Sequence, residues 1–187
     1  MARYNLPLLP ILVCSTLLFA FVVYNIPTTT PAPAKMSAPN ISELQISITQ
    51  KSASPLVLTT TLRNPTTSPV SILPWNSPLD ALAPSVGVFR VFAAASGDEV
   101  DAAFMRINRL VPPPKEDVVF VPAGGEVSVD HELKEFRLQP GKYRVEAAWT
   151  WMQVWWVEGS QVDEAMLEAA ANQGQGEELK VVVEIEI

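Results

Sequence analysis

The stretch EVSVDHEL, residues 126–133, alternates polar and apolar side chains with a period of two. Val127, Val129, His131 and Leu133 fall on one face of an extended chain, and the acidic and hydroxyl side chains fall on the other. This pattern is typical of a strand with one face buried and one face in water. The turn PAGG at residues 122–125 directly precedes it, so the sequence predicts a strand that begins at a tight turn.

Short segments of the same kind lie on both sides of this strand. They are separated by Pro- and Gly-rich turns, and long helical periodicity is absent. Such spacing predicts an all-β, immunoglobulin-like β-sandwich. One short helix is expected at residues 161–171, capped by Ser160, inside an insertion at 151–176 that precedes the last strand. The other predicted strands are 43–50, 56–63, 70–73, 86–92, 104–111, 118–121, 143–150 and 178–187.

Ahead of this domain the chain begins with a segment of a different composition. Residues 6–23 are 18 residues without a charge, long enough for a helix of about 27 Å that matches a bilayer core. We therefore expect residues 1–24 to form a transmembrane or signal helix, as an uncleaved signal anchor in preference to a cleaved signal peptide. Arg3 predicts that the amino terminus stays cytoplasmic, which places the rest of the chain outside the cytosol.

Residues 25–42 are rich in Pro, Thr and Ala, and they predict an extended stalk before the domain at 43–187. Asn40-Ile41-Ser42 is an N-glycosylation sequon at the junction. The expected location is the secretory pathway: a single-pass membrane protein with a lumenal or extracellular domain, or a secreted protein if the segment is cleaved.

Composition excludes several classes of function. The chain of 187 residues is 48% hydrophobic, which is enough for a core, and its net charge of −7 argues against nucleic-acid binding. Cys14 is its one cysteine and His131 its one histidine, so the sequence offers neither a disulfide nor a His/Cys zinc site. We expect no metal and no cofactor.

Five segments carry a further signal: 44–49, LRNP at 62–65, ILPWNSPLDAL at 72–82, VPAGGEVSVDHEL at 121–133 and LQPGKYRV at 138–145. They resemble parts of the N-terminal, non-catalytic β-rich domain of fungal secreted metallopeptidases of the deuterolysin and lysine-specific endopeptidase type. The resemblance covers residues 43–157. It implies a relative of an accessory domain without the catalytic domain, because the HExxH motif of those enzymes is absent from this sequence.

Catalytic residues are hard to assemble from this sequence. His131 is expected to be a core histidine, because Asp130 is adjacent on the strand and points to the opposite face, where it cannot orient the ring. The carboxylates Asp98, Glu99 and Asp101, and the pair Glu116 and Asp117, are expected to be solvated loop charges. The sequence therefore predicts no enzyme.

Tryptophans are the remaining candidates for binding. Four of them lie at residues 149–156, and Trp155 and Trp156 must point to opposite faces if the chain is extended there. We predict a non-enzymatic interaction or accessory module, related to a protease prodomain, with Trp151, Trp155 and Trp156 as the binding residues for a protein partner. Two alternatives stay open: a carbohydrate-binding module using the same rings, and a hydrolase that uses carboxylates alone.

Overall fold

The computed structural model describes residues 40–170 and 175–187, and these described residues belong to one compact unit. The predicted membrane or signal helix and all but the end of the stalk lie outside the described residues. Within the described ranges, no helix has the length and apolarity needed to cross a membrane. The one α-helix there is α2 (Glu164–Ala169), and three short 3-10 helices accompany it: η1 (Ile41–Glu43), η2 (Lys115–Asp117) and η3 (Gly159–Gln161).

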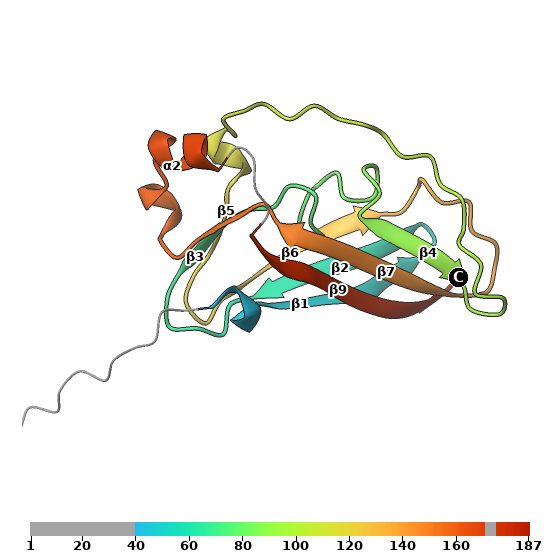
Figure 1. The fold of residues 1–187 in the computed structure, drawn as a ribbon. Coiled ribbons are helices and arrows are strands. Elements are labelled where there is room, and N and C mark those ends of the chain that lie inside the picture. The colour runs from blue at the N-terminus through green and yellow to red at the C-terminus, as the bar shows by residue number, and fades with distance from the viewer. Residues whose placement is uncertain (1–39, 171–174) are drawn as a thin grey trace, which may run out of the picture. The chain divides into compact units, whose positions relative to one another are not determined.

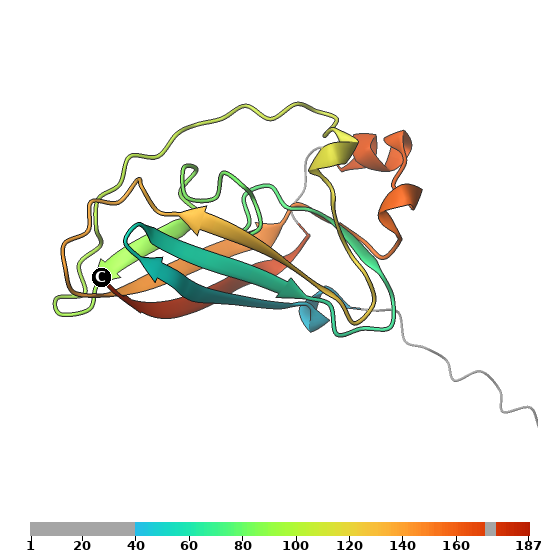
Figure 2. The same cartoon turned by 180° about the vertical axis from the view of Figure 1, so that it is seen from behind.

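Nine strands form three antiparallel sheets in the described part of the chain (Figures 1 and 2). One sheet has the order β1 (Gln45–Ala53), β2 (Leu56–Arg63) and β6 (Glu126–Glu132). A second has the order β4 (Phe89–Ala93), β7 (Lys142–Trp151) and β9 (Gln175–Glu186). The third is short, with β3 (Val70–Leu73) between β5 (Val119–Val121) and β8 (Gln153–Trp155).

The first two sheets enclose the main hydrophobic core. Leu58 from β2, Phe89 and Val91 from β4 and Val145 from β7 belong to one cluster, and all four are fully buried. The edge strands β1 and β9 are linked through Gln50. Its side-chain N–H donates to the Glu186 carbonyl at 2.7 Å, and its side-chain oxygen accepts from the Glu186 N–H at 3.1 Å. The predicted all-β sandwich is confirmed.

Alternation predicted β6 correctly. Val127 and Val129 are half-buried and His131 is buried, whereas the residues between them are exposed. The register with β2 places Leu58 opposite His131 and Leu62 opposite Val127, so apolar faces of neighbouring strands coincide. One-sided burial of an antiparallel sheet is the physical origin of the period of two.

One local prediction is wrong, and a second is correct only in part. Residues 104–111 form no strand and pair with no sheet, because the sheet positions beside β4 are already taken by β7 and by a bridge from Phe92 to Glu99. The helix α2 is shorter than predicted and is capped by Asp163, whose carboxylate accepts from the Met166 N–H at 2.8 Å. Ser160 lies in η3 instead.

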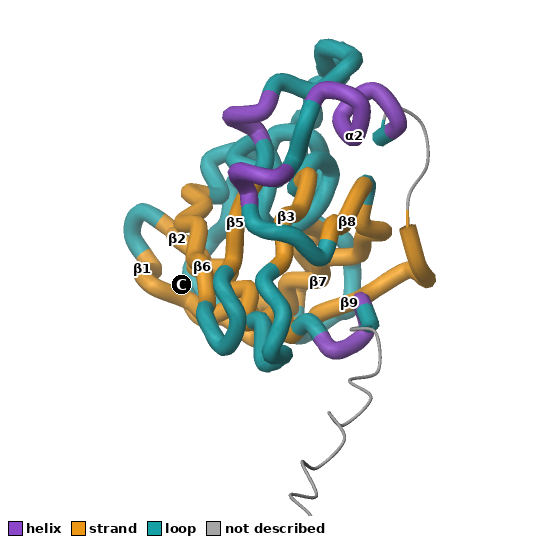
Figure 3. The backbone as a smooth tube through the Cα atoms, turned by 90° about the vertical axis from the view of Figure 1, so that its left-hand side faces the viewer, coloured by secondary structure: helices purple, strands orange, loops and turns teal. Residues whose placement is uncertain are grey.

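The short sheet and α2 form one end of the domain (Figure 3). A separate hydrophobic cluster lies there, in which Leu73 of β3 packs with Trp155 of β8 and with Val162 and Leu167 around α2. The segment predicted to be an insertion thus supplies strand β8 and a helix that closes this end.

Replacing the core residue Leu58 by Ala should lower the free energy of unfolding by about 2–5 kcal/mol, because the methyl groups removed leave a cavity in a fully packed site. Urea unfolding of the full chain measures this change. Val182→Ala is the control: Val182 is 48% exposed on β9, and we expect a change of about 0.5 kcal/mol or less. Equal losses in the two variants would contradict the assignment of the core.

Candidate interaction surface

Trp149 and Trp151 lie inside the domain. They share a face, as the alternation predicts, and their rings meet edge to face with centroids 5.7 Å apart and planes at 78°. Trp151 is 1% exposed and belongs to the cluster that also contains Leu62 and Val70. A partner cannot reach this indole without opening the packing.

Trp155 and Trp156 point to different clusters, as expected for neighbours on an extended chain. Trp155 is 8% exposed and packs in the end cluster, whereas Trp156 is half-buried against the cluster of Trp151. Of the three predicted binding residues, Trp156 therefore keeps the most accessible surface. Alternation indicates the face on which a side chain lies, but it does not indicate whether another layer covers that face.

His131 is a buried core residue. Its Nε2 lies 2.8 Å from the Pro78 carbonyl oxygen, and its ring packs against Phe89 at 5.2 Å between centroids. Burial lowers the pKa of His131, and the hydrogen bond to Pro78 offsets that effect only in part. Asp130 is on the outer face, where it pairs with Lys51 and accepts from the Thr59 hydroxyl, so the two residues cannot act together.

The candidate carboxylates have structural partners or lie in solvent. Glu99 forms a two-pronged ion pair with Arg90, and this contact lowers the pKa of Glu99. Asp117 accepts a hydrogen bond from the Trp75 indole at 2.9 Å, and Asp98 and Asp101 are exposed. Within residues 40–170 and 175–187, no three His, Cys, Asp or Glu side chains gather as metal ligands would.

A second surface was missed by the sequence analysis. Residues 102–111, here called the strap, run in extended form across the domain from the side of β4 toward α2 (Figures 1 and 2). The strap supplies four of the seven exposed large hydrophobic side chains of the described residues: Phe104 at 46% exposure, Met105 at 55%, Leu110 at 77% and Val111 at 57%. The signal was present in the sequence as apolar and cationic residues, without an acid, directly before three prolines.

The strap is held in place by a few specific contacts. Arg109 pairs with the buried carboxylate of Asp80, and its guanidinium lies 5.3 Å from the centre of the Trp75 ring. Asp80 also accepts from the N–H groups of Asn76 and Leu82, at 2.9 and 3.0 Å, so its charge is fully engaged. These bonds fix the strap on the loop that follows β3.

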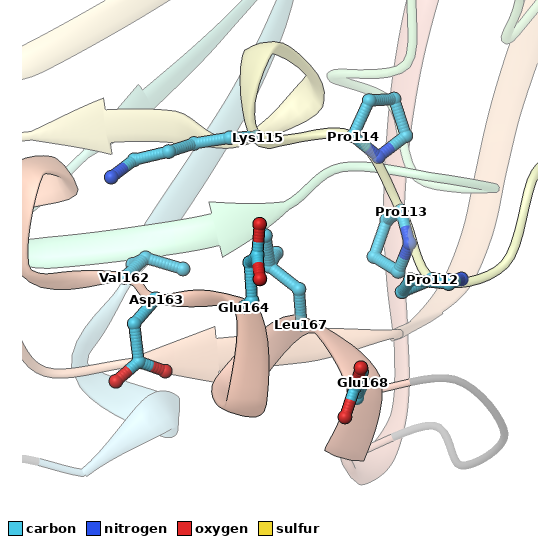
Figure 4. A pocket seen from close by; sticks show the side chains of 9 residues that line it. All are labelled: Pro112, Pro113, Pro114, Lys115, Val162, Asp163, Glu164, Leu167 and Glu168. Carbon is cyan, nitrogen blue, oxygen red and sulfur yellow. The ribbon is translucent and has the colours of Figure 1, made fainter.

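A groove of about 700 Å³ continues the strap at its carboxyl end. Residues 112–114, all prolines, form one wall, and α2 with the residue before it forms the other. Figure 4 shows Glu164 and Leu167 pointing from α2 toward the prolines, whereas Asp163 points away. Glu164 and Glu168 are exposed, so the rim is acidic and solvated, unlike the enclosed site that a catalytic carboxylic acid needs.

Asn40 lies at the first described position of the domain and is exposed. It caps η1: its Oδ1 accepts from the Ser42 N–H at 3.1 Å, and its own N–H donates to Glu43 Oε1 at 2.9 Å. The side-chain nitrogen, which would carry a glycan, takes no part in this cap.

Comparison with known proteins agrees with the fold. A family model described as an immunoglobulin-like domain matches residues 43–183. A curated protein of Arthroderma benhamiae, named "Uncharacterized secreted protein", is 36% identical over 110 residues, which cover 56% of this chain and 56% of that protein. The chain thus spans little more than half the length of this relative.

Acid should destabilise the fold through His131. In the unfolded chain the imidazole titrates near its ordinary pKa of 6.5, while burial lowers the pKa in the folded state. As the pH falls below 6.5, the unfolded state takes up a proton that the folded state does not, so the free energy of unfolding decreases. Urea unfolding between pH 6.5 and 5 should show this slope in the wild type and lose most of it in His131→Gln. An unchanged slope in the variant would assign the acid sensitivity to other groups.

We expect one N-linked glycan at Asn40 when the chain passes through a eukaryotic secretory pathway. Treatment with an N-glycosidase should then lower the mass of the wild type but not that of Ser42→Ala, which removes the sequon and keeps the Asn40 cap. Asn64 is the internal control, because it is fully buried and the central Pro65 prevents Asn64-Pro65-Thr66 from being a sequon. A mass shift that persists in Ser42→Ala would contradict the assignment.

Proposed function

Because the chain belongs to the immunoglobulin-like domain family, we propose that it is a non-enzymatic, extracytoplasmic module that binds another protein through the strap. The observation that carries this proposal is the exposure of Phe104, Met105, Leu110 and Val111 on one continuous segment. Exposed apolar side chains grouped in this way, with polar residues around them, are typical of protein-interaction sites. Leu110 and Val111 are the most exposed members and are the best candidates for contact residues.

The chemistry of the rest of the domain supports a binding role over catalysis. His131 is covered, Asp117 is engaged with Trp75, and Glu164 and Glu168 are exposed to water. General acid–base catalysis at carboxylates usually needs one of them in a desolvated or strongly coupled environment. These positions do not supply one.

The resemblance to peptidase accessory domains suggests the class of partner. In the resembling enzymes this domain accompanies a secreted metallopeptidase, and the Arthroderma benhamiae relative is itself named as secreted. We propose that a secreted peptidase is the partner, held by this module in trans. Attachment to the membrane through residues 6–23, with the domain on the outer side, belongs to the same proposal.

The carbohydrate-binding alternative would need exposed, coplanar aromatic rings. Trp149 and Trp151 are buried and nearly perpendicular, and of Trp155 and Trp156 only the latter reaches the surface. A single half-buried ring offers little stacking area, so the apolar strap has the stronger claim to the binding role.

Replacing Leu110 and Val111 together by Asp should weaken partner binding at least tenfold, because each apolar contact at an interface centre contributes about 1–2 kcal/mol. The measurement is cross-linking capture from the native secreted fraction with the full chain, quantified by mass spectrometry for wild type and variant. Both residues are more than half exposed, so the fold should tolerate the change.

Val182→Asp is the control, since it introduces the same side chain at an exposed apolar position on β9, outside the strap. Proteins retained by this control and lost from the strap variant are the partners. If the same proteins are captured by all three chains, the strap is not the binding surface. If the strap variant retains its partners and a Trp156→Ala chain loses them, the tryptophan site is favoured instead.

A further inference from the structure

The strap is the one long, extended segment in the described part of the chain that joins no sheet. Its first residue, Ala102, forms an isolated antiparallel bridge with Phe136, and further along the Met105 N–H donates to the Ser85 carbonyl at 2.7 Å. The N–H and C=O groups of residues 106–111 have no backbone partner among residues 40–170 and 175–187. An extended backbone with free donors and acceptors can accept a further strand by main-chain pairing.

Side chains on the strap restrict what can pair with it. Leu110 and Val111 project apolar surface, and Phe104 is fixed in place by Phe136, at 6.1 Å between ring centres with planes at 69°. Gly87 lies directly beneath Phe104: a Cβ built at Gly87 would be 3.2 Å from its ring. Phe104 is therefore preorganised, and a partner segment needs apolar side chains opposite the apolar positions of the strap.

The charge of the strap is opposite to that of the protein. The whole chain carries −7, but residues 102–111 contain Arg106 and Arg109 and no acid. Arg109 is committed to Asp80, whereas Arg106 is exposed and forms no ion pair within the described ranges. One free guanidinium beside exposed apolar groups is complementary to a carboxylate on an apolar segment.

The groove beyond the strap has the reverse character. Glu164 and Glu168 line it, and Lys115, the one cation in its lining, donates to the Ser160 carbonyl at 3.3 Å. An acidic segment is repelled there, so its contacts end near Val111.

We propose that the strap binds an extended, acidic and apolar peptide segment of its partner by main-chain pairing, with a carboxylate of that segment on Arg106. This inference rests on the proposed function and adds the chemistry of the occupant. A peptide fits better than an anionic membrane, because a peptide backbone can pair with the free N–H and C=O groups of the strap and a lipid surface cannot.

The probe is a displayed library of random nine-residue peptides, selected on the immobilised full chain. Selected peptides should be enriched in Asp and Glu next to apolar residues. They should bind Arg106→Glu at least fivefold more weakly than wild type and should fail to bind the Leu110→Asp, Val111→Asp double variant. Arg63→Glu is the matched control: Arg63 is exposed at the end of β2, and this variant has the same net charge as Arg106→Glu.

Several outcomes would overturn the inference. These are the absence of selected peptides, a selected set without acidic enrichment, and equal binding by Arg106→Glu and Arg63→Glu. A parallel experiment measures sedimentation of the chain with phosphatidylserine vesicles. If sedimentation depends on Arg106 and no peptides are selected, the occupant is a lipid surface and not a peptide. The Leu110→Asp, Val111→Asp chain could lose its native partners while the selected peptides show no acidic enrichment. That result would support the proposed function and reject an acidic peptide as the occupant.

Discussion

Burial of two apolar sheet faces against each other is the interaction on which this domain depends. With one cysteine in the whole chain, at position 14, no internal disulfide can hold the sheets together. The sheets are therefore held together by the burial of apolar side chains. Four of these side chains have no water-accessible surface: Leu58, Phe89, Val91 and Val145. Packing of this kind tolerates little change in volume, which is why residues of the loops must accommodate variation and binding.

At one end of the sandwich the chain buries a charge as well. Asp80 is 3% exposed and is satisfied by two backbone N–H groups and by Arg109. A buried carboxylate that loses such a partner is costly, so this pair fixes the position of the strap relative to the loop after β3. Arg106, three residues earlier, is exposed and forms no ion pair within residues 40–170 and 175–187. Structural and proposed binding roles are thus divided between two arginines of one segment.

The tryptophans and the apolar residues of the strap lie in environments opposite to those that their residue types suggest. Tryptophans are frequent in binding sites, yet Trp151 and Trp155 lie in the core, 1% and 8% exposed. Leu110 and Val111 are ordinary core residues by type, yet they lie in water. Residue type therefore does not indicate how much of a side chain is exposed, because that depends on the layers that cover it in the fold.

Local sequence determined the strands whose faces differ in solvent exposure. The stretches 56–63 and 126–132 are recognisable as strands because one face of each strand is more buried than the other. That difference imposes a period of two on the sequence. It also placed His131 inside. Tertiary structure alone decided the course of residues 102–111 and the cover over Trp151 and Trp155. Whether an extended apolar segment pairs, packs or stays exposed depends on which neighbours already occupy the adjacent sheet edge, and those neighbours are distant in the sequence.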